Sequence, residues 1–319
     1  MTQNSLLRFR KLSLIFFAFI LTAVSCSKMP PGGDDEKKTI FQRIASDGRF
    51  TILTAAVNKA GLTTALNSKK NNLTLFAPTD DAFRSAGLGD PKVLAEIDEQ
   101  ALKNILLYHV LGSEVKSRDI PQAANTAVTT LANSSIFVTK TANSRVFVNG
   151  ISVIQRDLDC VNGVIHALGG VLLPASGNIV ATAQSNPDLS FLVEAVLRAS
   201  QGSTNVAAVL SSAGPFTVFA PTNKAFQDAG FPTIQSIQAA DPNTLTKILT
   251  YHVIAARVFS SDLVNNSTPA TVNGGTVKIL LSSGAQVKGN SNTVPSNIIK
   301  TNILTTNGVV HVIDRVLLP

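Results

Sequence analysis

Residues 73–83 read Leu73-Thr74-Leu75-Phe76-Ala77-Pro78-Thr79-Asp80-Asp81-Ala82-Phe83, and a close copy begins 143 residues later as Phe216-Thr217-Val218-Phe219-Ala220-Pro221-Thr222-Asn223-Lys224-Ala225-Phe226. Seven of the eleven positions are identical. In each copy a short apolar run predicts a buried strand, and the Pro-Thr that follows ends the strand and supplies a threonine that can cap the next helix. We expect the following side chains to be structural, with the last phenylalanine of each copy facing the core: Phe76, Pro78, Thr79 and Phe83, and Phe219, Pro221, Thr222 and Phe226.

Two further blocks recur in the same order. The segment 105–111 returns 143 residues later at 248–254, and both copies contain Tyr-His. The sequence Asn-Gly-Val-(Ile or Val)-His at 162–166 returns at 307–311, and Val-Leu-Leu-Pro follows it each time. A period this long is the size of a complete domain rather than of a solenoid unit. We therefore expect two tandem domains: residues 39–174 and residues 175–319.

The apolar pattern changes along each copy. Apolar residues recur three and four apart in the first half, which predicts amphipathic helices over 40–60, 99–110, 188–199 and 243–253. The second half is rich in Val, Ile, Thr and Phe and is interrupted by Asn, Ser and Gly. In the first copy this predicts strands over 126–131, 136–140, 145–148, 152–157 and 164–168. Helices followed by strands predict an α+β fold, with N-terminal helices packed on a small antiparallel β-sandwich.

The N-terminal residues have the pattern of an export signal. Three basic residues within 8–11 precede a mostly apolar run of 13 residues, 12–24, whereas a helix that spans a bilayer needs about 20. We expect a lipoprotein signal peptide over 1–25; a short buried helix is the alternative for the same run. Residues 26–38 are polar and contain Pro and Gly, which predicts a flexible tether.

Cys26 is the predicted site of a lipid anchor. The sequence Ala23-Val24-Ser25-Cys26 resembles a bacterial lipobox, although a larger aliphatic residue is usual at the position of Ala23. The resemblance implies that Cys26 is acylated and that the protein is a cell-envelope lipoprotein of the outer membrane or cell surface; plain secretion stays open. Cys160 is then left without an intrachain partner, and we expect it to be a small buried residue rather than a reactive thiol.

The repeated blocks resemble the fasciclin-like (FAS1) domain in both copies. The resemblance rests on Phe-Ala-Pro-Thr-x-x-Ala-Phe, the central Tyr-His and the Asn-Gly-Val-x-His block, and it covers about 39–174 and 178–319. It implies two tandem wedge-shaped α+β domains in a secreted or membrane-anchored protein of adhesion or matrix, without known catalytic activity. The implied partner is a protein or glycan of the matrix or cell envelope.

The Tyr-His pairs have two interpretations. Some fasciclin-like domains are thought to contact receptors through a Tyr-His segment, so the resemblance implies recognition by these residues: Tyr108 and His109, and Tyr251 and His252. The structural interpretation places them in the core, because apolar residues flank each pair on a helix that must face other elements.

The residues around the Asn-Gly turn are a second candidate region. In related domains a short segment before this turn is credited with adhesion, which implies a binding role for Asp157; the second copy has Asn302 nearby and lacks the acid. His166 and His311 follow the turn and are predicted to be structural residues on a strand face. Neither block carries a third ligand at metal-binding spacing, so we expect no metal site and no cofactor.

Charge and composition disfavour other classes of function. The net charge is +7, from 27 basic and 20 acidic residues, and each predicted domain is close to neutral, without a basic stripe that would bind nucleic acid. Four His, two Cys and no Trp leave few catalytic candidates. The pair Asp80-Asp81 is expected to be a solvated helix N-terminus. We expect a non-catalytic adhesion or binding protein; the alternative is a small-ligand carrier or envelope enzyme with a pocket at the domain interface.

Overall fold

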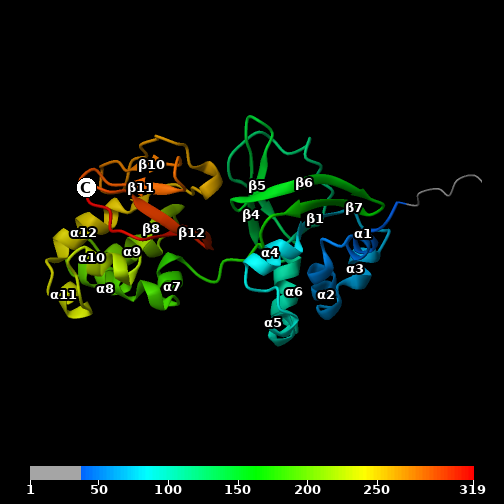
Figure 1. Ribbon diagram of the computed structural model, residues 1–319, viewed down its shortest axis with the longest axis horizontal. Helices are drawn as coiled ribbons and strands as arrows, with labels where there is room; N and C mark the ends of the chain where they lie inside the picture. Colours follow the sequence, from blue (N-terminus) through cyan, green and yellow to red (C-terminus); the bar gives the residue numbers. More distant parts are fainter. Residues whose placement is uncertain (1–36) are drawn as a thin grey trace, which may run out of the picture. The chain divides into compact units, whose positions relative to one another are not determined.

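The computed structural model describes residues 37–319. The predicted signal peptide, Cys26 and most of the predicted tether lie outside the described residues. In each of the two repeated halves, the helices gather on one side of the strands (Figure 1).

The first half begins with three short helices, α1 (Ile40–Ser46), α2 (Thr51–Lys59) and α3 (Thr63–Asn67). Thr39 starts α1 with a capping box: its Oγ1 accepts a hydrogen bond from the Gln42 amide at 3.2 Å, and the Gln42 side chain accepts one from the Thr39 amide at 2.9 Å. The single helix predicted over 40–60 is therefore wrong. The chain leaves the helical conformation at Asp47 and re-enters it after Phe50, whose fully buried ring packs in the core.

The sheet of the first half has seven strands in the order β2-β1-β7-β6-β5-β4-β3. Three helices, α4 (Asp80–Ser85), α5 (Pro91–Glu96) and α6 (Glu99–Leu107), lie between its first two strands in sequence. The strands are β1 (Leu73–Pro78), β2 (Val110–Leu111), β3 (Thr126–Thr129), β4 (Ser135–Lys140), β5 (Val146–Val148), β6 (Ile151–Cys160) and β7 (Gly163–Leu168).

The second half repeats this plan with six strands in the order β10-β11-β12-β13-β8-β9. Its helices are α7 (Ile179–Gln184), α8 (Ser190–Ala199), α9 (Val206–Ser211), α10 (Asn223–Asp228), α11 (Ile234–Gln238) and α12 (Pro242–Tyr251). Its strands are β8 (Phe216–Pro221), β9 (Val253–Ile254), β10 (Lys278–Leu280), β11 (Gln286–Lys288), β12 (Ser296–Thr305) and β13 (Gly308–Ile313). Two short 3₁₀ turns cover Pro187–Leu189 and Ser260–Asp262. The predicted α+β fold of tandem wedge domains is confirmed.

The central strand pair of each sheet is parallel, unlike the antiparallel pairs around it. β1 runs parallel to β7, with Phe76 opposite His166, and β8 runs parallel to β13, with Phe219 opposite His311. A parallel pair needs a long crossover, here the helices and the remaining strands, and it is buried on both faces. Every residue of β1 and β7 is accordingly buried. An antiparallel sheet predicted from local spacing misses this pairing, because the two strands are far apart in sequence.

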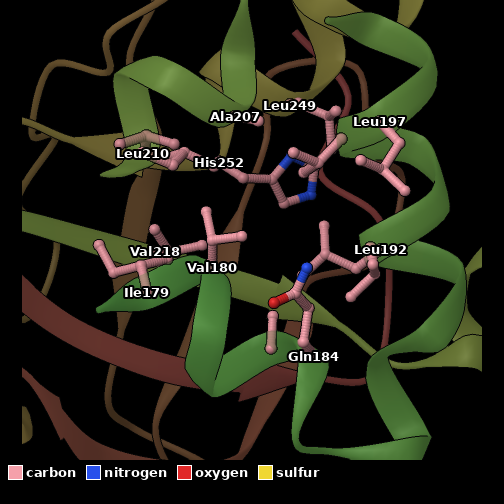
Figure 2. Close-up of a pocket in the computed structure, with 14 residues that line it drawn as sticks. Ile179, Val180, Gln184, Leu192, Leu197, Ala207, Leu210, Val218, Leu249 and His252 are labelled. Carbon is pink, nitrogen blue, oxygen red and sulfur yellow. The ribbon is translucent and has the colours of Figure 1, made fainter. Parts of the chain in front are cut away.

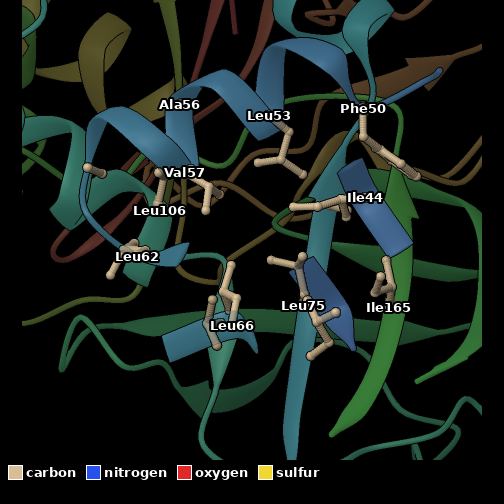
Figure 3. Packing of buried hydrophobic residues seen from close by; sticks show 14 of the residues in the cluster. Ile44, Phe50, Leu53, Ala56, Val57, Leu62, Leu66, Leu75, Leu106 and Ile165 are labelled. Atoms are coloured by element: carbon tan, nitrogen blue, oxygen red, sulfur yellow. The ribbon is translucent and has the colours of Figure 1, made fainter. Parts of the chain in front are cut away.

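Each sheet separates two apolar clusters. Leu75 and Ile165 point into the larger cluster of the first half, which the helices cover (Figure 3). Phe76 points the opposite way into a smaller cluster together with Tyr108. The second half divides in the same way, because neighbouring strand residues face opposite sides of a sheet. The blocks shared by the two copies therefore lie where both clusters meet the central strands.

Candidate functional site

The first Tyr-His pair lies inside the first half, at the end of α6. The Tyr108 side chain is 0 % exposed. Its hydroxyl donates a hydrogen bond to the carbonyl of Ser135 at 2.8 Å and accepts one from the Asn149 amide group at 3.1 Å. Burial raises the pKa of Tyr108, so the hydroxyl stays protonated and able to donate.

His109 is held by two backbone groups. Its Nδ1 lies 2.8 Å from the carbonyl oxygen of Ile105, which can only accept, and its Nε2 lies 2.9 Å from the amide of Leu172, which can only donate. The ring is therefore neutral and carries its proton on Nδ1. Complete burial lowers the pKa of His109 to about 4, and both ring nitrogens are fully used.

The second Tyr-His pair repeats these contacts. The Tyr251 hydroxyl donates to the carbonyl of Thr276 and accepts from the Asn290 amide. His252 Nδ1 donates to the Ile248 carbonyl and Nε2 accepts from the Leu317 amide, both at 2.8 Å. Burial again lowers the histidine pKa to about 4. Neither pair presents a side chain to a partner, so a recognition role stays a prediction and the geometry favours the structural interpretation.

His166 and His311 lie on the opposite side of the sheet from the Tyr-His histidines. Their rings stack on the phenylalanines of the neighbouring parallel strand, with centroids 5.6 Å from Phe76 and 5.7 Å from Phe219 respectively. Each Nε2 donates to a loop carbonyl at 2.9 Å, and each Nδ1 accepts from a strand amide. Desolvation by burial lowers the pKa of both histidines.

Asp157 and Asn302 occupy the same place in the two copies. Each lies at an irregularity in the long strand before the Asn-Gly turn, with φ of 58° and 61° respectively, a conformation in which Asn and Asp are enriched. The Asp157 carboxylate accepts hydrogen bonds from the Ser117 amide, at 2.8 Å, and from the Ser117 hydroxyl. The Asn302 side chain accepts from the Ser260 amide and donates to the Ser260 hydroxyl, both at 2.7 Å.

The substitution of Asp by Asn between the copies therefore preserves a loop contact. Burial alone would raise the pKa of Asp157, and the hydrogen bonds from Ser117 outweigh it, so the pKa lies below its ordinary value. The Asp157 residue nevertheless remains exposed to solvent. Its adhesive role stays a prediction, while its contact with Ser117 is the feature that both copies share.

Sequence reasoning missed the role of Asn162 and Asn307, which open the Asn-Gly block. Asn162 is 0 % exposed; its Oδ1 accepts from the Ile40 amide at 2.8 Å, and its Nδ2 donates to the carbonyls of Leu66 and Ser68. It thereby fastens the start of α1 and the end of α3 to the sheet. Asn307 makes the same three contacts in the second half. The recurrence of this asparagine in both copies was the available signal.

The glycine after each asparagine is required by close approach. A Cβ atom at Gly163 would lie 1.9 Å from the Leu73 carbonyl oxygen, and one at Gly308 would lie 2.1 Å from that of Phe216. Only glycine lets the two parallel strands meet at this end.

The remaining predicted motif residues lie where strand β1 or β8 turns into a helix. Thr79 and Thr222 cap α4 and α10, accepting from backbone amides at 3.3 and 3.2 Å. Pro78 and Pro221 end the two strands. The rings of Phe83 and Phe226 are buried in the helix-covered clusters.

Metal ligands and the Cys160 thiol are the remaining groups with possible chemistry in the described residues. Within 37–319, no three His, Cys, Asp or Glu side chains are placed to hold a metal ion. Cys160 is half-buried, and desolvation raises the pKa of its thiol to about 11, which keeps it protonated. None of the helices in this range has the length and apolar character needed to cross a bilayer.

The sequence of this chain is similar to those of known proteins. A family model described as the fasciclin domain matches residues 48–174 and 188–319. The transforming growth factor-beta-induced protein ig-h3 of Sus scrofa is 28 % identical over 249 residues, which are 78 % of this chain and 35 % of that protein. The protein sll1735 of Synechocystis is 40 % identical over 141 residues, 44 % of this chain and 97 % of that one.

Among solved structures, a FAS1 domain pair from the insect cell adhesion molecule Fasciclin I aligns with a TM-score of 0.41 and 19 % identity, over 88 % of this chain and 96 % of that one. The chain spans about a third of the length of the ig-h3 relative. The two matches to the family model together cover most of the chain. The chain belongs to the fasciclin domain family and contains two fasciclin domains in tandem.

Proposed function

We propose that this protein is a non-catalytic, lipid-anchored adhesion or binding protein, which holds a protein or glycan of the matrix or cell envelope on the outer surface of its two fasciclin domains. Family membership supports an adhesion-type role, by analogy rather than by a site. The proposed domains are 39–174 and 175–319, preceded by a signal peptide over 1–25 and a tether over 26–38.

One observation carries the proposal: the polar side chains common to both copies form hydrogen bonds within their own domain. The four histidines each have both ring nitrogens paired with backbone groups. Buried polar groups that are fully paired stabilise a fold but offer nothing to a substrate. A general base needs a free ring nitrogen within reach of a substrate, and these histidines have none. Recognition is therefore left to the surface, where the two copies differ.

The surface hypothesis is tested with the purified full chain on arrays of glycans and of matrix and envelope proteins. Saturable binding without turnover of any arrayed compound is the expected result. Turnover of a small substrate at a rate proportional to the concentration of this chain would contradict the non-catalytic assignment. A carrier or enzyme with a pocket at the domain interface is the alternative that such turnover would favour.

The proposed anchor is tested by metabolic labelling with palmitate in a bacterial host. We expect the wild-type chain to be labelled and to sediment with membranes, because two or three acyl chains supply stable attachment. The variant Cys26→Ala is expected to lose both properties, while the neighbouring control Ser27→Ala keeps them. An unlabelled wild-type chain would exclude the anchor and leave plain secretion.

A further inference from the structure

The second domain contains an apolar cavity between its helices and its sheet. The walls come from α7, α8, α9, α12 and strands β8 and β9, and the hollow including its open mouth measures about 540 Å³. The cavity volume within this hollow is about 40 Å³, roughly three times the space that one water-sized sphere needs. Figure 2 shows the His252 ring and the Gln184 side chain on opposite sides of this hollow, with aliphatic side chains around them. A cavity of about 40 Å³ admits the end of an alkyl chain but not a ring system.

The chemistry of the lining is almost entirely aliphatic. No charged residue lines the cavity, and the polar side chains are those of Gln184 and His252. His252 has no free nitrogen, since both are bonded to backbone groups. Gln184 is exposed at the end of α7, and its side-chain amide group has no hydrogen-bond partner among the described residues. An ionised ligand group finds no counter-charge in this lining, whereas an uncharged polar group needs none and can bond to Gln184.

The first domain fills the matching positions with larger side chains. Ile44 is the fifth residue after the N-cap of α1, and Ala183 is the fifth after the N-cap of α7. Leu75 is the third residue of β1, and Val218 is the third of β8. Ile44 and Leu75 are 0 % and 2 % exposed and lie in the core shown in Figure 3. The second domain has thus lost side-chain volume at two positions that line its cavity.

The mouth of the cavity has changed in the opposite direction. Leu197 lines the cavity, is 48 % exposed, and stands where the matching position of α2 has Asn58. Val193 likewise stands where α2 has Thr54. A loss of packing alone explains smaller residues inside but not apolar residues at the entrance, because exposing a leucine to water gives no stability. Smaller residues inside and apolar residues at the mouth together are what an apolar ligand requires.

We propose that this cavity binds the alkyl chain of an uncharged lipid, with the polar end of the lipid at Gln184. The aliphatic walls take up the chain, replacing the contacts that Ile44 and Leu75 make in the first domain. The absence of charged residues from the lining selects against fatty-acid carboxylates. This site is independent of the surface proposed for adhesion.

The probe for the test is decan-1-ol, with decanoate as the charged counterpart, and binding is measured by ligand-observed NMR. The full chain carries Cys26→Ala, so that no acyl chain of its own competes. We expect decan-1-ol to bind with a dissociation constant below about 1 mM, and decanoate to bind at least about tenfold more weakly. Equal or tighter binding of decanoate would overturn the assignment of an uncharged lipid, and no binding of decan-1-ol would overturn the site.

Two kinds of variant locate the site. The pair Ala183→Ile and Val218→Leu restores the residues of the first domain, and we expect it to weaken decan-1-ol binding at least about tenfold. The rim variant Leu197→Asp, at a position exposed enough to leave folding intact, is expected to weaken binding by a similar factor. The control Val264→Asp, at a 63 % exposed position outside the cavity lining, is expected to bind normally. The proposal would be overturned if decan-1-ol binding were unchanged in Leu197→Asp and also in the double variant Ala183→Ile and Val218→Leu, provided that the double variant folds.

A last comparison distinguishes a separate lipid from the protein's own anchor. Wild-type chain purified from membranes is analysed by native mass spectrometry for a non-covalent lipid and by NMR for decan-1-ol binding. A bound uncharged lipid in the wild type, missing from Leu197→Asp, supports the proposal. Exclusion of decan-1-ol from the acylated chain without any non-covalent lipid would mean that the anchor fills the cavity, which would overturn the proposal of a separate lipid.

Discussion

At the scale of single residues, the two copies show which chemical properties the fold needs. Asp157 and Asn302 differ in charge yet make the same contacts with a loop serine. An oxygen acceptor in a left-handed backbone conformation is the common requirement, and the negative charge is not. The sequence alone suggests the reverse, because it implies a binding role for the acid in the first copy and the loss of that role in the second.

The substitution Asp157→Asn tests this directly. We expect the variant to fold with a melting temperature close to that of the wild type and to bind its partner equally well, because the amide oxygen keeps the hydrogen bond from Ser117. Thermal unfolding and the array assay measure the two properties. Loss of binding with an unchanged melting temperature would show that the carboxylate contacts the partner, and Asn302→Asp is the matched variant in the other copy.

At the scale of elements, the sequence predicted the repeated strand, turn and helix well and the long-range pairings poorly. Thr79 and Thr222 cap helices as expected, since a cap depends on neighbours in sequence. Asp80 was expected to be solvated but is buried, with its carboxylate accepting from the Ile52 amide at 2.9 Å. That contact joins α2 to α4. The local sequence pattern does not predict this contact or the parallel pairing of β1 with β7, because each joins residues that are far apart in the sequence.

Asn162 gives the clearest prediction about elements. Asn162→Ala removes three hydrogen bonds and leaves the Ile40 amide and the Leu66 carbonyl unpaired, while the Ser68 carbonyl keeps only its bond from the Asn71 amide. We expect the change to cost about 2–4 kcal/mol of unfolding free energy. Urea denaturation measures the loss, and hydrogen exchange should show faster opening of α1. The control Asn72→Ala changes an exposed asparagine and is expected to cost less than about 0.5 kcal/mol. Equal stability of the two variants would contradict the role of Asn162 in holding α1 and α3 to the sheet.

At the scale of the whole molecule, the buried histidines make stability depend on pH. The pKa values of His109 and His252 are about 4 in the folded protein, against an ordinary value of 6.5. Below pH 6.5 the unfolded chain takes up protons that the folded protein cannot accept until about pH 4, so acid favours unfolding over this window. The pKa values of His166 and His311 are lowered in the same direction.

We therefore expect the free energy of unfolding to fall between pH 7 and pH 4. The loss approaches roughly 3 kcal/mol for each of His109 and His252, from 1.36 kcal/mol per pKa unit. Urea denaturation at pH 7.5, 5.5 and 4.5 measures it. Asp47 and Asp159, whose pKa values lie below 3.8, lose their contribution at lower pH and do not account for a change in this window. Constant stability from pH 7.5 to 4.5 would show that the histidines are not held neutral.

The most direct test of the account combines stability and partner binding in the variants Tyr108→Phe and Tyr251→Phe. Each loses a buried hydroxyl with two hydrogen bonds, and we expect each to cost about 1–3 kcal/mol of unfolding free energy. Binding of the folded protein to its array partner is expected to stay at the wild-type level. Loss of partner binding at unchanged stability would contradict the claim that the residues common to both domains build the scaffold and leave recognition to its surface.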